Sequence, residues 1–365
     1  MAVTLKDIAK ATGVNDSTVS HALKNDAYAQ RLRQETRERI RKVAHEMGYR
    51  SNLIASAMRT GRNQNITFIN DFSREQTAQI LSDLLESVTK HGFGLKLYSD
   101  VDLDYTFGEI LRNQLHYIIS VSMNPEKRKQ IAVFANRHHL KLVFIYEKGY
   151  GHFPAFITDN FKAISDAANY LYSIGHRRIS FLCQKHNAYA SECVRERHNG
   201  YVSAIRELGL PLNEKLIYCG NDTEEGILPI LQLPEKERPT AFLCFSPGVM
   251  FSATYMIYNY GFRVPEDFSL MTFESAIPHS NEYVVVNLDN PPGRRSIQFR
   301  IRGIQEPHSE VIESAVDYLI HGKTSLSPNK ENCYAFACQI NSETVGPTVI
   351  RGPASQTEKQ SRKGG

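Results

Sequence analysis

The first sixty residues carry apolar side chains at the period of an α-helix, interrupted once by a glycine. Thr4 and Asp7 have the spacing of a helix N-cap with an acidic partner in the first turn, and the pattern behind them predicts a short helix. Gly13 supplies the backbone freedom that a tight turn needs, and Asn15 can cap a second helix. Two short helices across such a turn predict a helix-turn-helix at residues 5–23.

The second predicted helix has a short polar face. Val19, Ala22 and Leu23 recur on its apolar side and are expected to face a small core. The side chains left outside are Asp16, Ser17, Ser20 and His21. Carboxylate, hydroxyl and imidazole groups can all meet base edges when the start of such a helix enters a major groove. A third amphipathic helix is predicted at residues 35–47.

Beyond residue 65 the pattern changes to short apolar runs that alternate with amphipathic segments, which is typical of parallel sheets flanked by helices. One group of strands is predicted at residues 66–69, 95–98, 117–121 and 142–145, and a second group at residues 179–183, 216–219, 241–245 and 269–273. The helices between them are predicted at residues 79–90, 107–113, 126–137, 164–174, 194–208 and 250–260. The sequence therefore predicts an all-α N-terminal domain followed by an α/β core with two groups of strands.

Composition narrows the class of protein. The 365 residues are 41% hydrophobic and 22% charged, as in ordinary soluble proteins, and no stretch approaches the roughly 20 apolar residues of a membrane span. The N-terminus lacks the basic head and apolar run of a secretory signal, so we expect a cytoplasmic protein without membrane contact. The six cysteines show no C-x-x-C spacing, which favours reduced, mostly buried thiols over a zinc site or a disulfide framework.

Charge is distributed unevenly along the chain. The net charge is +4, yet residues 1–62 hold twelve Lys and Arg against six Asp and Glu, a balance of +6, so the remaining residues sum to −2. A compact basic head on a nearly neutral body is the electrostatic footprint of a protein that binds a polyanion, although a run of charge is also compatible with a solvated face. The sequence motifs decide between a polyanion-binding surface and a solvated face.

The head resembles the DNA-binding domain of the LacI/GalR family. The resemblance lies in Val3-Thr4-Leu5-Lys6-Asp7-Ile8-Ala9, Gly13-Val14, Ser17-Thr18-Val19-Ser20, Glu35-Thr36-Arg37-Glu38-Arg39-Ile40, Gly48-Tyr49 and Asn52. It implies that a homodimer binds a palindromic operator, with the second helix in the major groove and a hinge helix at residues 52–60 in the minor groove. The residues that it assigns to DNA contact are Thr4, Asn15, Asp16, Ser17, Thr18, Ser20, His21, Thr36, Asn52, Ala55, Met58 and Arg59.

Three features of the head depart from the family pattern. His21 stands where an arginine is usual, which removes the common bidentate contact to guanine. The loop at residues 25–34 is longer than usual, and Arg33 stands where a small capping hydroxyl is common. Met58 replaces the usual leucine wedge of the hinge; it can prise apart a base step, or it can pack between two hinge helices.

The body resembles the same family more diffusely. The matching segments are Thr158-Asp159-Asn160, Gly175-His176-Arg177-Arg178-Ile179, Arg195-Glu196-Arg197, Gly200-Tyr201, Arg238-Pro239-Thr240-Ala241 and Val264-Pro265-Glu266-Asp267. The resemblance implies a core like a periplasmic binding protein of type I, with two doubly wound lobes, three crossing strands and a ligand cleft between the lobes.

The resemblance also predicts domain boundaries. It implies a return to the first lobe after about Leu288 and a crossing back after Gly322. The predicted boundaries are a DNA-binding domain at 1–62, an effector-binding and dimerisation core at 63–350 and a polar tail at 351–365, with lobe one at 63–158 and 289–321 and lobe two at 159–288 and 322–350.

The expected effector site differs from the family pattern. The candidate effector-binding residues are Tyr146, Asp159, Arg197, Ser246 and Glu274. Arg197 matches the family's effector-contacting arginine, although its position on a helix is also compatible with solvent exposure, and Asp159 is equally suited to cap the helix that follows it. Tyr146 and Ser246 replace short polar residues, and an unpaired buried polar group costs about 1 to 3 kcal/mol, so an ordinary hexose is not expected.

The patterns together predict a DNA-binding transcription regulator, expected to act as a repressor, whose operator affinity responds to a small-molecule effector, a sugar or another metabolite. No phosphate-binding loop, nucleophile elbow or H-E-x-x-H motif is present, so we expect neither an enzyme nor a cofactor or metal site. A transported-solute receptor would need an export signal, and a core that responds to a protein partner stays open. The basic stretch at residues 291–302 is expected to be a solvated insertion, and the tail has no leucine heptads for a tetramerising coil.

Overall fold

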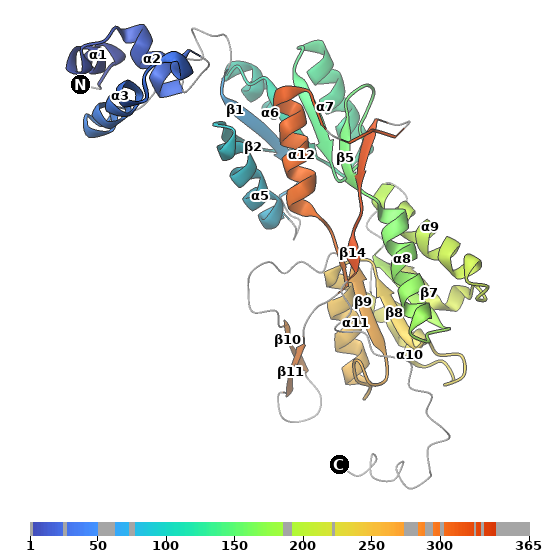
Figure 1. Ribbon diagram of the computed structural model, residues 1–365. Coiled ribbons are helices and arrows are strands. Elements are labelled where there is room, and N and C mark those ends of the chain that lie inside the picture. Colours follow the sequence, from blue (N-terminus) through green and yellow to red (C-terminus); the bar gives the residue numbers. More distant parts are fainter. Residues whose placement is uncertain are drawn as a thin grey trace. The chain divides into compact units, whose positions relative to one another are not determined.

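A computed structural model describes residues 3–24, 28–49, 63–72, 77–184, 192–220, 223–273, 284–288, 295–299, 303–324, 326–329 and 332–340. The chain divides into two compact units, Met1–Gln64 and Asn65–Gly365 (Figure 1). The first unit is all-α, and the second contains two six-stranded sheets and a separate two-stranded one. Within the described part of the chain, no helix combines the length and the apolar character needed to cross a bilayer.

The first unit is a small helical domain around one core. Its elements are α1 (Leu5–Thr12), α2 (Asp16–Lys24), the 3-10 helix η1 (Ala29–Arg31) and α3 (Gln34–Glu46). Ile8, Val19 and Ile40, one from each α-helix, are fully buried against one another. The predicted capping pair is confirmed, because the Thr4 hydroxyl accepts from the Asp7 amide and the Asp7 carboxylate accepts from the Thr4 amide. The helix-turn-helix prediction is therefore correct in both position and capping.

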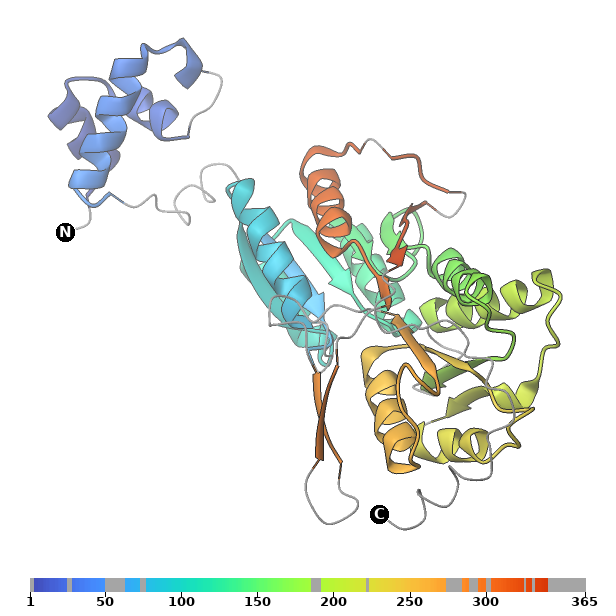
Figure 2. The same ribbon diagram turned by 60° about the horizontal axis from the view of Figure 1, so that its bottom comes forward.

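Lobe one of the second unit is a parallel sheet covered by helices on both faces. Its strands are β1 (Asn65–Asn70), β2 (Gly94–Ser99), β3 (Tyr117–Val121), β4 (Lys141–Ile145), β5 (Ala155–Thr158) and β13 (Cys333–Phe336), in the spatial order β13-β5-β4-β3-β1-β2. Its helices are α5 (Thr77–Lys90), α6 (Leu103–Arg112), α7 (Pro125–Arg137) and α12 (His308–His321). Alternate residues of the strands pack against α5 and α12 on one face and against α6 and α7 on the other (Figure 2). This arrangement explains why the strands read as continuous apolar runs.

Lobe two repeats the same architecture. Its strands are β6 (Ile179–Gln184), β7 (Ile217–Gly220), β8 (Ala241–Cys244), β9 (Ser269–Phe273), β12 (Gly303–Gln305) and β14 (Gln339–Ile340), in the spatial order β14-β12-β9-β8-β6-β7. Its helices are α8 (Asn160–Ser173), α9 (Glu192–Glu207), α10 (Thr223–Leu231) and α11 (Pro247–Asn259), with the 3-10 helix η2 (Glu214–Leu216) before β7. Helices α8 and α9 cover one face and α10 and α11 the other. Only β12 and β14 pair antiparallel among the described strands of this sheet.

The described chain passes between the lobes three times, and two of these crossings lie away from their predicted positions. The first follows β5, as expected. The second lies between β12 and α12 and not near Leu288, because β12 pairs with β9 in the sheet of lobe two. The third lies between β13 and β14 and not at Gly322, because β13 pairs with β5 in lobe one. The prediction failed here because β12, β13 and β14 are only three, four and two residues long and leave little periodicity to detect.

The stretch between β9 and β12 contains a separate hairpin. Strands β10 (Val284–Leu288) and β11 (Arg295–Phe299) pair antiparallel and form a two-stranded sheet of their own. Five residues of the predicted basic loop at 291–302 are therefore a strand and not a loop. The sequence analysis also missed α10, α12 and β5. The described cysteines are free thiols, and four of the six are buried, as expected.

Candidate functional site

The polar face of α2 is open in the helical domain. Asp16 and Ser17 in its first turn are exposed, and Ser20 and His21 one turn later are half-buried. The Asn15 Oδ1 atom accepts from the Thr18 amide at 2.7 Å, which gives the helix the N-cap expected from the sequence. The first turn of α2 therefore presents a carboxylate and a hydroxyl to solvent from a capped, rigid helix start.

The other residues assigned to DNA by resemblance occupy different surroundings. Thr18 is buried in the domain, whereas Thr4 is exposed and Thr36 half-buried in the first turn of α3. The His21 ring lies 4.5 Å from the Tyr28 ring, centroid to centroid, so η1 supports the outer end of the face. Arg33 is the N-cap residue of α3 and makes no side-chain capping bond, as the departure from the family pattern suggested. Asn52, Ala55, Met58 and Arg59 lie outside the described residues.

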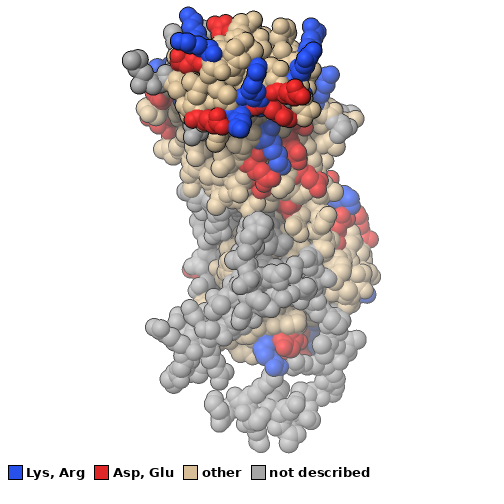
Figure 3. Space-filling view, turned by 60° about the vertical axis from the view of Figure 1, so that its left-hand side comes forward, with Lys and Arg blue, Asp and Glu red and all other residues tan. Residues whose placement is uncertain are grey.

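The helical domain carries exposed charged side chains of both signs. On the face that Figure 3 draws, Lys and Arg side chains stand out among Asp and Glu side chains. The pKa of the Asp7 carboxyl lies below its ordinary value because it accepts hydrogen bonds from Thr4, so this acid is charged at neutral pH. Within the described part of the helical domain, exposed basic and acidic side chains therefore occur together.

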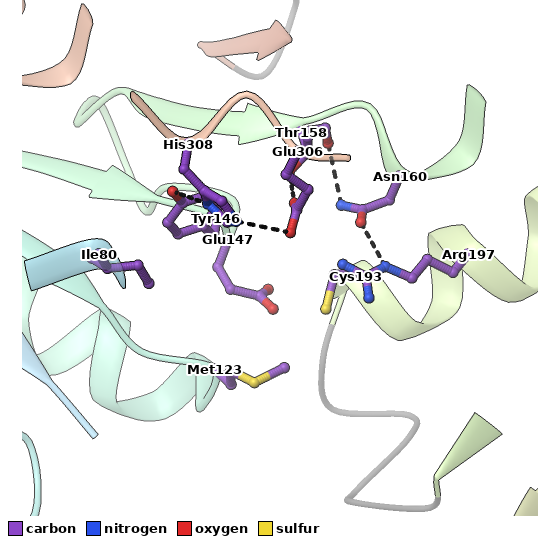
Figure 4. A pocket seen from close by; sticks show the side chains of 10 residues that line it. All are labelled: Ile80, Met123, Tyr146, Glu147, Thr158, Asn160, Cys193, Arg197, Glu306 and His308. Atoms are coloured by element: carbon purple, nitrogen blue, oxygen red, sulfur yellow. Dashed lines mark hydrogen bonds and ion pairs between the residues drawn. The ribbon is translucent and has the colours of Figure 1, made fainter. Parts of the chain in front are cut away.

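A pocket that opens to solvent lies where the two lobes meet. Its walls come from α5, from the carboxyl ends of lobe-one strands, from the crossings and from the first turns of α9 (Figure 4). The lining residues are Ile80, Met123, Tyr146, Glu147, Thr158, Asn160, Cys193, Arg197, Glu306 and His308. Ligands of doubly wound sheets bind at the carboxyl ends of the strands, where this pocket lies.

A chain of polar contacts runs along one wall of the pocket and spans two crossings. The Tyr146 hydroxyl and His308 Nδ1 are 2.7 Å apart, and His308 Nε2 lies 4.0 Å from a Glu306 carboxylate oxygen. The Thr158 hydroxyl donates to Glu306, and Asn160 Nδ2 donates to the Thr158 carbonyl at 3.2 Å. Because Thr158 precedes the first crossing and Glu306 lies in the second, a ligand that contacts either residue also touches the joint between the lobes (Figure 4).

Arg197 completes this wall from lobe two. It is only 4% exposed, and its guanidinium donates to Asn160 Oδ1 at 2.8 Å and to the Phe245 carbonyl at 2.9 Å. The same group lies 3.3 Å from the centroid of the Phe273 ring, a close cation–π contact. The structure therefore places Arg197 in the pocket wall and excludes a solvent-exposed helix position.

On the opposite side of the pocket, the lining residue Glu147 is paired with a buried arginine. Glu147 is 3% exposed, and its carboxylate lies 3.5 Å from Arg128, which is also buried and donates to the Ser122 carbonyl. A buried carboxylate needs such a partner, because an isolated charge is expensive to remove from water. The pocket lining thus combines two carboxylates, Glu147 and Glu306, with the guanidinium of Arg197. Arg128 lies behind Glu147 and balances its charge.

An ion-pair cluster lies at the meeting of the lobes. Lys148, after β4 of lobe one, contacts Glu192 at 3.2 Å and Glu196 at 3.5 Å, both on α9 of lobe two. Burial raises the pKa of Glu196, and the positive charge of Lys148 opposes that rise. Arg195 also contacts Glu192, at 3.0 Å and within the same helix. Lys148 therefore links the lobes electrostatically, whereas Arg195 does not.

Sequence reasoning found part of this pocket. Tyr146 and Arg197 line it as predicted, but Asp159 accepts from the Lys162 amide as the N-cap of α8, and its neighbours on either side line the pocket instead. Ser246 is the N-cap residue of α11 and is not among the lining residues. Glu274 lies outside the described residues.

The sequence analysis missed the acidic and imidazole groups of the pocket. Glu147 directly follows the predicted Tyr146, so a shift of one residue along the strand end would have found it. Glu306 and His308 carried no signal, because the second crossing was placed elsewhere. Thr158 and Asn160 stand in a segment that matches the family, which was the available clue to their position.

A helix-turn-helix followed by a two-lobed core with a polar pocket between the lobes defines a class of ligand-responsive DNA-binding regulators. Residues 4–52 match the family described as bacterial regulatory proteins, lacI family, and residues 168–288 match the periplasmic binding protein-like domain. Both matches confirm the resemblance to the LacI family that the sequence indicated, and the function that they support is that of a DNA-binding transcription regulator.

Named relatives and solved structures agree with this family. The chain is 25% identical to the transcriptional regulator RegA of Clostridium saccharobutylicum over 80% of this chain and 88% of the relative. It is 27% identical to the transcriptional repressor CytR of Escherichia coli strain K12 over 75% of this chain and 80% of that protein. The solved structure of the lac repressor dimer bound to operator and the anti-inducer ONPF has a TM-score of 0.65, at 17% identity, over 94% of this chain and 99% of that one, which supports the fold. These relatives are regulators and not enzymes.

Proposed function

We propose that this protein represses transcription as a homodimer on a palindromic operator, and that a small polar metabolite in the pocket between the lobes changes its DNA affinity. The proposal rests on one observation: the same chain carries an open polar helix face and a polar pocket between its lobes. The pocket includes residues from two of the segments that cross between the lobes. The site of action is the cytoplasm, where the operator lies, and no catalytic step is part of the proposal.

The DNA-reading role rests on the first turn of α2. Asp16 and Ser17 are the exposed groups at its start, and Ser20 and His21 follow on the same side. A helix start with such groups fits the major groove, where carboxylates accept from cytosine and hydroxyls contact either partner of a base pair. We assign Thr4, Asn15 and Thr36 to contacts with the phosphate backbone of the DNA beside the groove. Thr18 is buried, so its proposed role is to hold α2 in place.

The hinge assignment remains as the sequence predicted it. Asn52, Ala55, Met58 and Arg59 are proposed to contact the minor groove at the centre of the operator. Met58 is assigned as the apolar wedge there, because a flexible apolar side chain can enter a base step and kink the duplex.

The homodimer is supported by an apolar surface of lobe one. Leu85 on α5, Leu97 on the edge strand β2, Val101 and Tyr105 are between 49% and 78% exposed. Large apolar side chains grouped on neighbouring elements mark an interaction site more often than a solvated surface. A second copy of the chain is the partner that also matches a palindromic operator, because a two-fold dimer presents two identical heads.

The effector is proposed to be a nearly neutral metabolite with several hydroxyl or amine groups, such as a sugar or nucleoside. The carboxylates of Glu147 and Glu306 accept hydrogen bonds, Arg197 and Asn160 can donate them, and Ile80 provides an apolar wall. The two buried carboxylates are acceptors of the kind that the sequence analysis found missing, which supports a sugar or nucleoside as the effector. Asp159, Ser246 and Glu274 are assigned no direct contact in this proposal.

The effector acts by binding the two arrangements of the lobes unequally. A ligand shifts an equilibrium only by its differential affinity for the two states, and Thr158 and Glu306 connect the pocket to two crossings. A change in lobe angle is thereby transmitted to the chain that leads to the DNA-binding domain.

Footprinting and a ligand screen test the two halves of the proposal. The full chain should protect a palindromic site in DNA upstream of its own or a neighbouring gene, and mixed-sequence DNA should be bound more weakly at the same salt. A thermal-shift screen should find a hydroxylated metabolite that stabilises the core by about 2.7 kcal/mol at 100 times its Kd. Equal affinity for palindromic and mixed DNA would contradict the operator assignment, and no response to any sugar or nucleoside would contradict the effector assignment.

A further inference from the structure

Three metal-ligating side chains meet on lobe one, away from the effector pocket. His91 lies in the turn after α5, and Asp317 and His321 lie one helical turn apart on α12. One ligand atom from each residue lies within 4.8 Å of the other two. Two imidazoles and a carboxylate from two packed helices thus converge on one point.

The cluster lies at the amino ends of the strands, whereas the effector pocket lies at their carboxyl ends. His91 comes three residues before Gly94, the first residue of β2, which pairs in register with Asn65 at the start of β1. On α12, the Leu319 and Ile320 carbonyls accept from Lys141, the first residue of β4. The cluster therefore lies on the edge of the sheet at which the chain enters the core from the DNA-binding domain.

The His91 ring is oriented as in a metal ligand. Its Nδ1 lies 2.9 Å from the Ser87 carbonyl oxygen, which can only accept, so Nδ1 carries the proton. Its Nε2 then points at Asp317 Oδ1, 2.8 Å away. Metal-bound histidines commonly donate their second ring nitrogen to a backbone carbonyl, which fixes the tautomer and the ring plane. Asp317 and His321 stand at i and i+4, so they project from the same side of α12.

We propose that His91, Asp317 and His321 bind a divalent transition-metal ion of the Zn²⁺ class. Imidazole nitrogen with one carboxylate oxygen suits Zn²⁺ and its neighbours, whereas Ca²⁺ and Mg²⁺ prefer oxygen ligands alone. The side chains are half-buried or exposed, so they can close by rotation to the distances of about 2.0 to 2.2 Å that Zn²⁺ requires. Water would complete the coordination.

A bound ion would join α5 to α12 at their carboxyl ends. Both helices cover the same face of the sheet, and their buried residues belong to one apolar core. Lys90, next to His91, is held by Glu86 at 3.0 Å, and that carboxylate offsets part of its repulsion toward a cation. The ion would therefore stabilise lobe one independently of effector and DNA.

The test measures Zn²⁺ binding by the full-length, tag-free chain after removal of metal with a chelator. Isothermal titration with Zn²⁺ alone is compared among the wild type, His321→Ala, Asp317→Asn and the control His139→Asn. His139 is an exposed histidine of the same lobe with a positive φ, which asparagine also adopts, so the control removes an imidazole and keeps the backbone. We expect the two cluster variants to bind at least about tenfold more weakly, as for the loss of supporting groups at metal sites, and the control to bind as the wild type.

Thermal unfolding of the same proteins provides the second measurement. Zn²⁺ should raise the Tm of the wild type and of His139→Asn, and it should raise the Tm of His321→Ala by less at the same Zn²⁺ concentration. Without metal, all variants should unfold within about 1 kcal/mol of the wild type, because Asp317 and His321 are exposed and a partly exposed pair such as His91 with Asp317 contributes little. Equal Zn²⁺ affinity in wild type and cluster variants would assign the binding to cysteines or other groups and overturn the proposal, as would a wild type that does not bind.

Discussion

At the scale of single residues, Arg197 shows how a buried charge can be held at the wall of a pocket. Its guanidinium is bonded to a side-chain amide and a backbone carbonyl, and an aromatic ring lies against it. Arginine is suited to this position because its planar group stacks and donates in several directions. The same geometry leaves the group at the pocket wall, where a ligand can reach it.

Arg197→Met should weaken effector binding more than it weakens the fold. The substitution keeps most of the volume and removes the donors to Asn160 and Phe245, so we expect a stability loss of about 1 to 3 kcal/mol and at least a tenfold loss of effector affinity. Denaturant unfolding and calorimetric titration with the effector measure the two quantities.

Arg177→Met is the matched control for this prediction. Arg177 also lies over an aromatic ring, that of Tyr172 at 3.8 Å, and donates to that residue's carbonyl, but it is not among the residues that line the effector pocket. Equal effector affinity in Arg197→Met and Arg177→Met would show that Arg197 has no part in ligand binding.

Residues 158–160 show that neighbouring side chains can have different roles. Asp159 was an equally good candidate for a ligand and for a helix cap from sequence, and it is a cap, whereas Thr158 and Asn160 line the pocket. Successive side chains at a strand end point in alternate directions. An error of one residue in a prediction therefore selects a helix cap in place of a residue that lines the pocket.

At the scale of elements, the N-cap keeps the first turn of α2 ordered. The Asn15 cap satisfies an amide that the helix cannot pair internally. Asn15→Ala should lower the stability of the DNA-binding domain by about 1 kcal/mol and weaken operator binding, because the first turn of α2 frays. Hydrogen exchange at the α2 amides and a footprinting titration measure these effects.

The corresponding control lies in the core. Asn124 caps α7 through the Glu126 amide at 2.9 Å, so Asn124→Ala removes the same type of cap from lobe one. It should leave α2 exchange and operator affinity unchanged. If Asn15→Ala also left α2 exchange and operator affinity unchanged, the Asn15 cap would not be what keeps the polar face of α2 in place.

Contacts between elements of different lobes bear on closure of the pocket. Lys148→Met removes the cation that joins the end of β4 to α9, and burial then raises the pKa of Glu196 without opposition. We expect effector affinity to fall by at most about fivefold, because partly exposed ion pairs contribute no more than roughly 1 kcal/mol.

Arg195→Met separates closure from simple loss of charge. It removes a cation from the same cluster but breaks only a contact within α9. Calorimetric titration of both variants with the effector should therefore show a loss for Lys148→Met alone. A similar loss in both would mean that local charge, and not the link between lobes, sets the affinity.

At the scale of the whole molecule, the two compact units suggest separable tasks. The division between Gln64 and Asn65 leaves every described lining residue of the pocket in the second unit. A fragment of residues 65–365 should therefore keep the effector affinity and thermal stabilisation of the full chain and lose operator binding. Calorimetry and footprinting test this, and a fragment that folds yet fails to bind the effector would show that the helical domain contributes to the pocket.

Local physics made much of this protein predictable from its sequence. Helical period, caps and turn glycine specify the helix-turn-helix, since each depends on residues within a few positions of one another. The apolar runs of the core strands were equally readable, because a parallel sheet covered on both faces needs them. Arg197 was identified by its place in a segment that resembles the family, and Tyr146 by its position directly after a predicted strand.

Other features depended on contacts that no local pattern records. The short strands β12, β13 and β14 owe their sheet membership to partners far away in the chain, so the crossings at residues 305–308 and 336–339 became visible only in the fold. Glu306 and His308 reach the pocket because of those crossings, and His91 meets Asp317 across 226 positions of sequence. The sequence alone determined the helices of the first unit, what that unit is for and most of the longer helices and strands of the core. The tertiary structure decided which short segments become strands and which distant side chains share a site, because both depend on strand pairing and helix packing between segments separated along the chain.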